Sequence, residues 1–178
     1  EAQTIKQRFL WLVNCDIRYN SSNLILPLLI GMICFSFKVW LIMLIENIAT
    51  RFSDTDGLGH INNTMLPIWF EGARNPIFKL FTPDLSLQKW QLIIAKFDVE
   101  FHSELFYGDD IEIRTGVSRL GSSSFDVYQE AWQGGRLCAS GTAVHVHFDH
   151  QEKVTKPLSE ALRDKLLTHA AQKRVSTS

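Results

Sequence analysis

The sequence predicts an α+β domain in which an antiparallel sheet wraps around one long helix. Residues 63–81 carry apolar side chains at helical spacing, and the segments between residues 96 and 148 alternate apolar with polar residues. With 178 residues, 46% of them hydrophobic, the chain suffices for one full core and requires no second domain. The helix can bury its aromatic residues together only if the sheet wraps around it.

A strand is expected over Met43 to Phe52, directly before the helix over Asn63 to Phe81. Pro67 falls near the first turn of that helix, where proline is tolerated, and the helix ends at Thr82-Pro83-Asp84. The apolar stripe of the helix consists of Leu66, Trp69, Phe70, Ala73, Ile77 and Phe81.

Four further strands should form a meander, because each is separated from the next by turn residues. The strongest of these signals is Gly134-Gly135, which is typical of a hairpin. A C-terminal helix should open at Pro157. The strands are expected around Phe97–Phe101, Ile111–Val117, Phe125–Val127 and Arg136–Phe148.

Composition excludes some classes of function. The formal net charge is −1 and no long Lys/Arg tract is present, so nucleic-acid binding is not expected. Cys15, Cys34 and Cys138 are odd in number and lack zinc-type spacing, which favours reduced thiols and a cytoplasmic location.

Residues 1–42 form an apolar leader that we expect to lie outside the functional fold. The run from Leu24 to Ile45 is long enough to span a bilayer, and basic residues precede it as in a signal anchor. Pro27 and Lys38 weaken that interpretation. The alternative is upstream sequence before a domain that begins at Met43, so residues 43–178 are expected to function without a membrane.

The stretch from Arg51 to Asn63 is the candidate functional segment. It sets Asp56, His60 and two asparagines on one glycine-containing turn before a helix. A carboxylate, an imidazole and free backbone N–H groups at a helix N-terminus can activate a nucleophile and polarise a carbonyl. The alternative is structural: the acids form Asx turns, and Asn62 or Asn63 caps the helix.

The sequence Asp54-Thr-Asp-Gly-Leu-Gly-His-Ile-Asn-Asn63, with Trp69-Phe-Glu-Gly-Ala-Arg74 downstream, resembles hotdog-fold acyl-CoA thioesterases of the 4-hydroxybenzoyl-CoA thioesterase type. The resemblance spans about residues 43–170 and implies a single hotdog domain with a five-stranded sheet. The loop is also similar to a motif of plant acyl-ACP thioesterases, but Leu58 stands where that motif has asparagine. A mechanism that uses that amide therefore does not transfer.

The resemblance implies that Asp56 is the catalytic aspartate and that Asp54 has a more structural role. Asp56 would act either as general base or as nucleophile, and the two remain open. The N–H of Asn63 would stabilise the oxyanion. His60 would orient the substrate or support the site, unless it is only a turn residue.

The remaining candidate residues concern substrate binding. Gly59, Asn62 and Trp69 are expected to contact the substrate, and Glu71 either reaches the loop or pairs with Arg74. Arg119, with Ser122 and Ser123, is the first candidate for the coenzyme A phosphates. The weaker alternatives are Arg74, Lys79, Arg136 and Lys153.

We expect neither a cofactor nor a metal. His145 and His147 share one face of a strand, but two ligands fall short of a metal site, so packing is the expected role.

The predicted function is hydrolysis of an acyl-CoA thioester to free acid and coenzyme A in the cytoplasm. The alternatives are a non-catalytic acyl-CoA-binding hotdog module and a hotdog dehydratase. A single sheet leaves an unpaired edge, so a homodimer or homotetramer is expected. Acyl-chain identity stays open.

Overall fold

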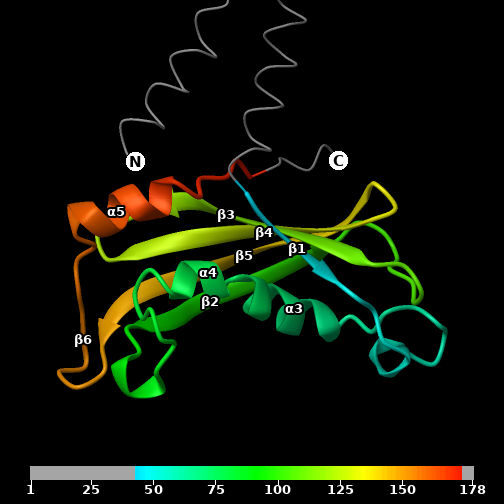
Figure 1. Ribbon diagram of the computed structural model, residues 1–178, viewed down its shortest axis with the longest axis horizontal. Coiled ribbons are helices and arrows are strands. Elements are labelled where there is room, and N and C mark those ends of the chain that lie inside the picture. Colours follow the sequence, from blue (N-terminus) through cyan, green and yellow to red (C-terminus); the bar gives the residue numbers. More distant parts are fainter. Residues whose placement is uncertain (1–42, 174–178) are drawn as a thin grey trace, which may run out of the picture. The chain divides into compact units, whose positions relative to one another are not determined.

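The computed structural model describes residues 43–173 (Figure 1). The interpretations of residues 1–42 lie outside the described residues. The helical elements are the 3-10 turns Phe52–Asp54 and Leu87–Lys89 and the helices α3 Met65–Ala73, α4 Asn75–Phe78 and α5 Glu160–Leu167. The strands are β1 Leu44–Ile48, β2 Leu92–Phe101, β3 Ile111–Leu120, β4 Ser124–Gln133, β5 Arg136–Asp149 and β6 Val154–Thr155.

The five longer strands form an antiparallel sheet in the order β1-β3-β4-β5-β2, and the short β6 pairs with β5. The predicted α+β class is therefore confirmed. The expected four-strand meander is wrong, since only β3, β4 and β5 are sequential neighbours. β1 pairs with the edge of β3 that β4 leaves open, so β2 pairs with the remaining edge of β5. Residues 102–110 then connect β2 to β3.

Helices α3 and α4 lie along one face of the sheet (Figure 1). The single long helix expected over residues 63–81 is instead split at Arg74, because Pro76 occupies the start of α4. Proline has no N–H to donate, and its ring clashes with the carbonyl four residues earlier. Pro67, by contrast, lies in the first turn of α3 as expected.

The core consists of two clusters along these helices. The first joins Leu66, Trp69 and Phe70 of α3 to Ile111 and Ile113 of β3. The second surrounds α4 and α5 and includes Ile77, Phe78, Phe81, Phe125 and Leu166. Cys138 is free and buried.

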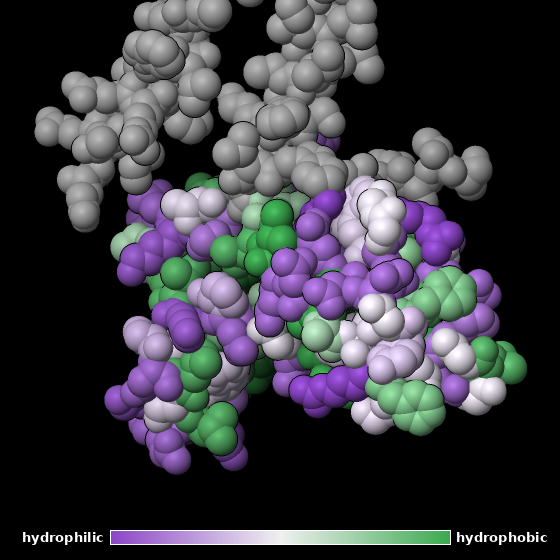
Figure 2. Space-filling view, turned by 45° about the vertical axis from the view of Figure 1, so that its right-hand side comes forward, coloured by the Kyte–Doolittle hydropathy of each residue, from purple (hydrophilic) through white to green (hydrophobic). Residues whose placement is uncertain are grey.

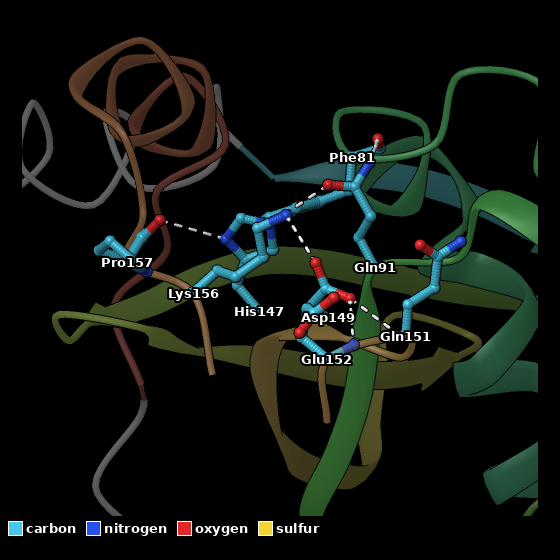
Figure 3. Close-up of polar contacts among 8 residues, drawn as sticks. All are labelled: Phe81, Gln91, His147, Asp149, Gln151, Glu152, Lys156 and Pro157. Carbon is cyan, nitrogen blue, oxygen red and sulfur yellow. Dashed lines mark hydrogen bonds and ion pairs between the residues drawn. The ribbon is translucent and has the colours of Figure 1, made fainter. Parts of the chain in front are cut away.

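The two histidines of β5 are buried, which confirms their predicted packing role. Nδ1 of His147 lies 3.2 Å from the Pro157 carbonyl and Nε2 lies 3.3 Å from Oε1 of Gln91 (Figure 3). Pro157 thus belongs to a connection attached to β5, and not to the C-terminal helix as predicted. The helix begins at Glu160, after Ser159 accepts a hydrogen bond from Leu162 N.

No helix between residues 43 and 173 combines the length and the apolar composition of a membrane-spanning segment.

Candidate active site

The loop that follows β1 folds back on the Asp56 side chain. Oδ1 of Asp56 accepts hydrogen bonds from the backbone N–H groups of Leu58 at 2.8 Å and His60 at 3.1 Å. The N–H of Asp56 donates to the His60 carbonyl at 2.8 Å. Gly59 has φ +85°, a conformation that glycine adopts without strain. Within residues 43–173, Oδ2 of Asp56 has no hydrogen-bond partner.

The other acid of the loop, Asp54, has a different environment. Its side chain is buried and accepts a hydrogen bond from Arg51 N at 2.8 Å, and its carbonyl accepts one from Asn62 N at 2.8 Å. Asp54 therefore joins the two ends of the loop.

The connection between β2 and β3 supports the other side of His60. Ile61 N donates to the Leu105 carbonyl at 2.8 Å, and the imidazole packs edge-on against the Phe106 ring with centroids 5.2 Å apart. Nε2 of His60 lies 3.8 Å from Oε1 of Glu104. Two segments far apart in the sequence thus meet at one imidazole.

These segments enclose an open pocket of about 480 Å³. The pocket brings together four candidate residues of the loop with apolar and acidic groups from helix α3 and the β2–β3 connection. Its lining is Asp56, His60, Ile61, Asn62, Asn63, Leu66, Phe101, Ser103, Glu104 and Leu105.

The start of α3 differs by one to two residues from the predicted N-cap. The helix begins at Met65 after Thr64, which provides no side-chain cap. Oδ1 of Asn62 accepts hydrogen bonds from the N–H of Thr64 at 3.0 Å and its hydroxyl at 2.9 Å, an Asx turn. Asn63 is exposed at the pocket.

Three residues predicted to contact the substrate lie outside the pocket lining. Gly59 is exposed on the loop. Trp69 is buried in the core, and Glu71 lies exposed on α3. The Glu71–Arg74 ion pair does not form between these described residues, because Arg74 turns inward and donates to Gln129 at 3.2 Å. Burial lowers the pKa of Arg74 to about 10, and the charge of Glu71 partly opposes that shift.

The candidate phosphate site is also separate from the pocket within one chain. Arg119 donates twice to Asp126, at 2.8 and 2.9 Å, and this pairing raises its pKa. The carbonyls of Ser122 and Ser123 accept hydrogen bonds from Leu158 N and His147 N. These residues lie near α5, at the opposite end of β3 from the pocket (Figure 1).

A family model of the thioesterase-like superfamily matches residues 50–166, more than half of the sequence, including the pocket and strands β2 to β6. The chain belongs to the thioesterase-like superfamily. This confirms the resemblance drawn from the loop and from the downstream helix.

Solved structures of thioesterases support the assignment of this chain to the superfamily. A predicted thioesterase from Bacillus stearothermophilus is 42% identical, with a TM-score of 0.72, and the match covers 74% of this chain and 99% of that one. A thioesterase from Thermus thermophilus, solved in complex with coenzyme A and Zn, is 27% identical with a TM-score of 0.63, covering 70% and 92%. The hotdog fold is thereby confirmed.

A curated relative is similar over part of its length. The uncharacterized protein YsmA from Bacillus subtilis (strain 168) is 28% identical over 102 residues, which is 57% of this chain and 69% of the relative.

Sequence reasoning about this thioesterase-like chain missed Ser103 and Glu104, which line the pocket. They lie in a polar connection without a motif, and their only signal was an acid and a hydroxyl directly after a strand. Their place beside His60 depends on β2 crossing to the far edge of the sheet, which the predicted meander did not include.

Proposed function

We propose that this chain hydrolyses an acyl-CoA thioester to a free acid and coenzyme A, with Asp56 at the reacting carbonyl. The observation that carries the proposal is the Asp56 carboxylate, which lines the pocket. Its Oδ1 is held by two backbone N–H groups, and its Oδ2 has no partner among the described residues. The coenzyme A bound to the Thermus thioesterase supports the substrate class. The odd number of cysteines favours a cytoplasmic location.

Two routes are compatible with this geometry. As a general base, Asp56 takes a proton from water while that water attacks the thioester carbon. As a nucleophile, it attacks the carbon itself, and water then opens the mixed anhydride. In both routes the thiolate of coenzyme A leaves without strong acid assistance, since a thiol resembles free Cys in acidity.

The surrounding groups supply orientation and charge stabilisation. We propose that the backbone N–H of Asn63 donates a hydrogen bond to the oxyanion, because Asn63 lies at the pocket just before α3. His60 lies on the same wall, with Glu104 3.8 Å from its Nε2, and orients the substrate. Gly59 and Asn62 hold the backbone of that wall in place.

We also propose that two copies pair through β2, the unpaired edge of the sheet opposite β1. Ile94 and Phe101 on this strand are 53% and 56% exposed, and Phe101 lines the pocket. A second copy would cover this apolar surface and close the pocket. Arg119, Ser122 and Ser123 could bind the coenzyme A phosphates only if those of one copy lay beside the pocket of the other copy.

The test is release of free thiol, measured with DTNB, from a panel of short, long and aromatic acyl-CoAs. Asp56→Asn should lower kcat by about 10²–10⁴-fold while acyl-CoA still binds, as measured by calorimetry. Glu152→Gln makes the same carboxylate-to-amide change at an exposed position between β5 and β6, outside the pocket lining, and should retain full turnover.

Near-normal turnover of Asp56→Asn would remove Asp56 from the reaction. Binding of acyl-CoA by the wild type without thiol release would identify a binding module. Conversion of the acyl group without free thiol would identify a dehydratase.

A further inference from the structure

Residues 102–110, here called the support loop, hold His60 and one wall of the pocket. Leu105 accepts the hydrogen bond from Ile61 N, and the Phe106 ring packs against the imidazole of His60. Ser103, Glu104 and Leu105 line the pocket themselves. The position of the support loop therefore sets both the direction of His60 and the shape of the wall.

One buried side chain attaches the middle of the support loop to the sheet. Gln133, the last residue of β4, is 7% exposed. Its Oε1 accepts a hydrogen bond from Phe106 N at 2.9 Å, and its Nε2 donates to the carbonyls of Phe106 at 2.8 Å and Asp109 at 3.0 Å. The Phe106 N–H can face only an acceptor, so this arrangement determines which way the amide points.

The other hydrogen bonds of the support loop hold its first residues or are more exposed. His102 N and Ser103 N donate to the Cys138 carbonyl at 2.8 and 3.0 Å, and Arg136 donates to the Glu104 carbonyl at 3.3 Å. Gly108 N donates to Oγ1 of Thr50 at 3.1 Å, and that hydroxyl lies 3.4 Å from the Asp109 carbonyl. Exposed hydrogen bonds exchange readily with water, whereas the loss of a buried amide leaves its partners unsatisfied. The hydrogen bonds of Gln133 therefore determine where the part of the loop around Phe106 and Asp109 lies.

We infer that Gln133 is a positioning residue of the thioesterase site, acting through the support loop on His60 and Ile61; the catalytic part of this inference rests on the proposed function. Gln133 does not touch the substrate. It completes a path of contacts from β4 through Phe106 and Leu105 to the loop that carries Asp56.

The first experiment needs no turnover. Gln133→Met keeps the approximate length of the side chain and removes all three hydrogen bonds. Hydrogen exchange measured by NMR should become at least about tenfold faster at the Ile61 amide, because the support loop no longer holds Leu105 in place. Unchanged protection of Ile61 would overturn the inference.

The matched control is Gln91→Met. Gln91 also attaches a segment to the sheet, since its Nε2 donates to the Phe81 carbonyl at 2.8 Å and its Oε1 faces His147 (Figure 3). It lies near β6, away from the pocket, and should leave Ile61 exchange unchanged. If Gln133→Met does not fold, Gln133→Glu retains the acceptor for Phe106 N, loses both donors, and should expose Ile61 in the same way.

The second experiment is a double-mutant cycle on kcat/KM. Gln133→Met should lower kcat/KM by about 10- to 100-fold in the wild-type background, since small displacements of a reacting group have effects of this size. In a His60→Ala background it should cause a smaller further loss, because one of the two residues through which it acts is gone. Equal losses in both backgrounds, or an equal loss for Gln91→Met, would show a merely structural role.

The two proposals fail separately. If the wild type releases no coenzyme A, the proposed function fails, and Ile61 exchange still decides the positioning role. If Asp56→Asn abolishes turnover and Gln133→Met does not reduce it, only the positioning role fails.

Discussion

His145 on β5 is a buried histidine between two aromatic rings. Its imidazole lies 5.4 Å from the ring centroids of both Phe78 and Phe125, and its Nε2 has no partner within the described chain. Burial lowers its pKa to about 3; the positive charge of Arg74 acts in the same direction, and Asp126 opposes it. The folded protein thus holds His145 neutral.

This depressed pKa predicts a loss of stability in acid. Between pH 6.5 and about 3 the unfolded chain binds a proton at His145 that the folded chain does not. The free energy of unfolding should therefore fall as pH drops below 6.5, by up to about 1.4 kcal/mol per pH unit from this residue. Urea unfolding at several pH values should show a shallower fall for His145→Phe.

The control for that prediction is His150→Phe, because His150 is exposed. It should keep the pH dependence of the wild type. If the free energy of unfolding fell equally with decreasing pH in the wild type and in His145→Phe, His145 would not be the source of the acid sensitivity.

At the residue scale, the sequence identified some residues of the site and missed others. The resemblance separated Asp56 from Asp54, and the different environments of the two side chains agree with that separation. It did not indicate Glu104 or Gln133, because neither belongs to a local motif. At the surface around the loop, Phe52 and Leu58 are 79% and 81% exposed, and the Phe52 ring packs edge-on against Tyr107. Figure 2, in which the right-hand side of Figure 1 comes forward, shows hydrophobic patches between hydrophilic ones on this face.

At the scale of elements, helix α3 packs closely on β5 at Gly141. A Cβ atom at this position would lie 2.6 Å from the Asp98 carbonyl of β2 and 3.0 Å from the Phe70 ring of α3. The glycine therefore allows the helix and both strands to approach one another.

Gly141→Ala should destabilise the fold by about 1–3 kcal/mol, because the added methyl group meets backbone that cannot move freely. Gly72→Ala is the matched control, and its effect on stability should have the opposite sign. Gly72 is helical and has no atom within 4 Å of its added Cβ, so alanine should stabilise α3 by up to about 1 kcal/mol. Thermal unfolding of both variants tests the pair, and equal melting temperatures would contradict the packing argument.

At the scale of the whole molecule, the family match covers residues 50–166, and the described residues of both core clusters lie between Leu44 and Leu166. We therefore propose that residues 43–178 fold and function without residues 1–42. Expression of 43–178 alone should give a soluble, active product, and an insoluble or inactive product would contradict this.

The assembly proposed through β2 is tested separately. Size-exclusion chromatography with light scattering should give at least twice the mass of the chain. Ile94→Lys places a charge on the exposed edge and should weaken the assembly. A stable wild-type monomer would contradict edge pairing.

The sequence by itself determined the α+β class, most strand positions and the loop that carries Asp56 and His60, because periodicity and motifs are local properties of the chain. Only the tertiary structure decided that β2 pairs with β5, that Pro76 splits the helix, and that Arg119 lies away from the pocket in one chain. It also placed Glu104 beside His60 and joined Gln133 to the support loop. These relations depend on which strand edge is free and on which buried polar groups find partners, and both depend on residues far apart in the sequence.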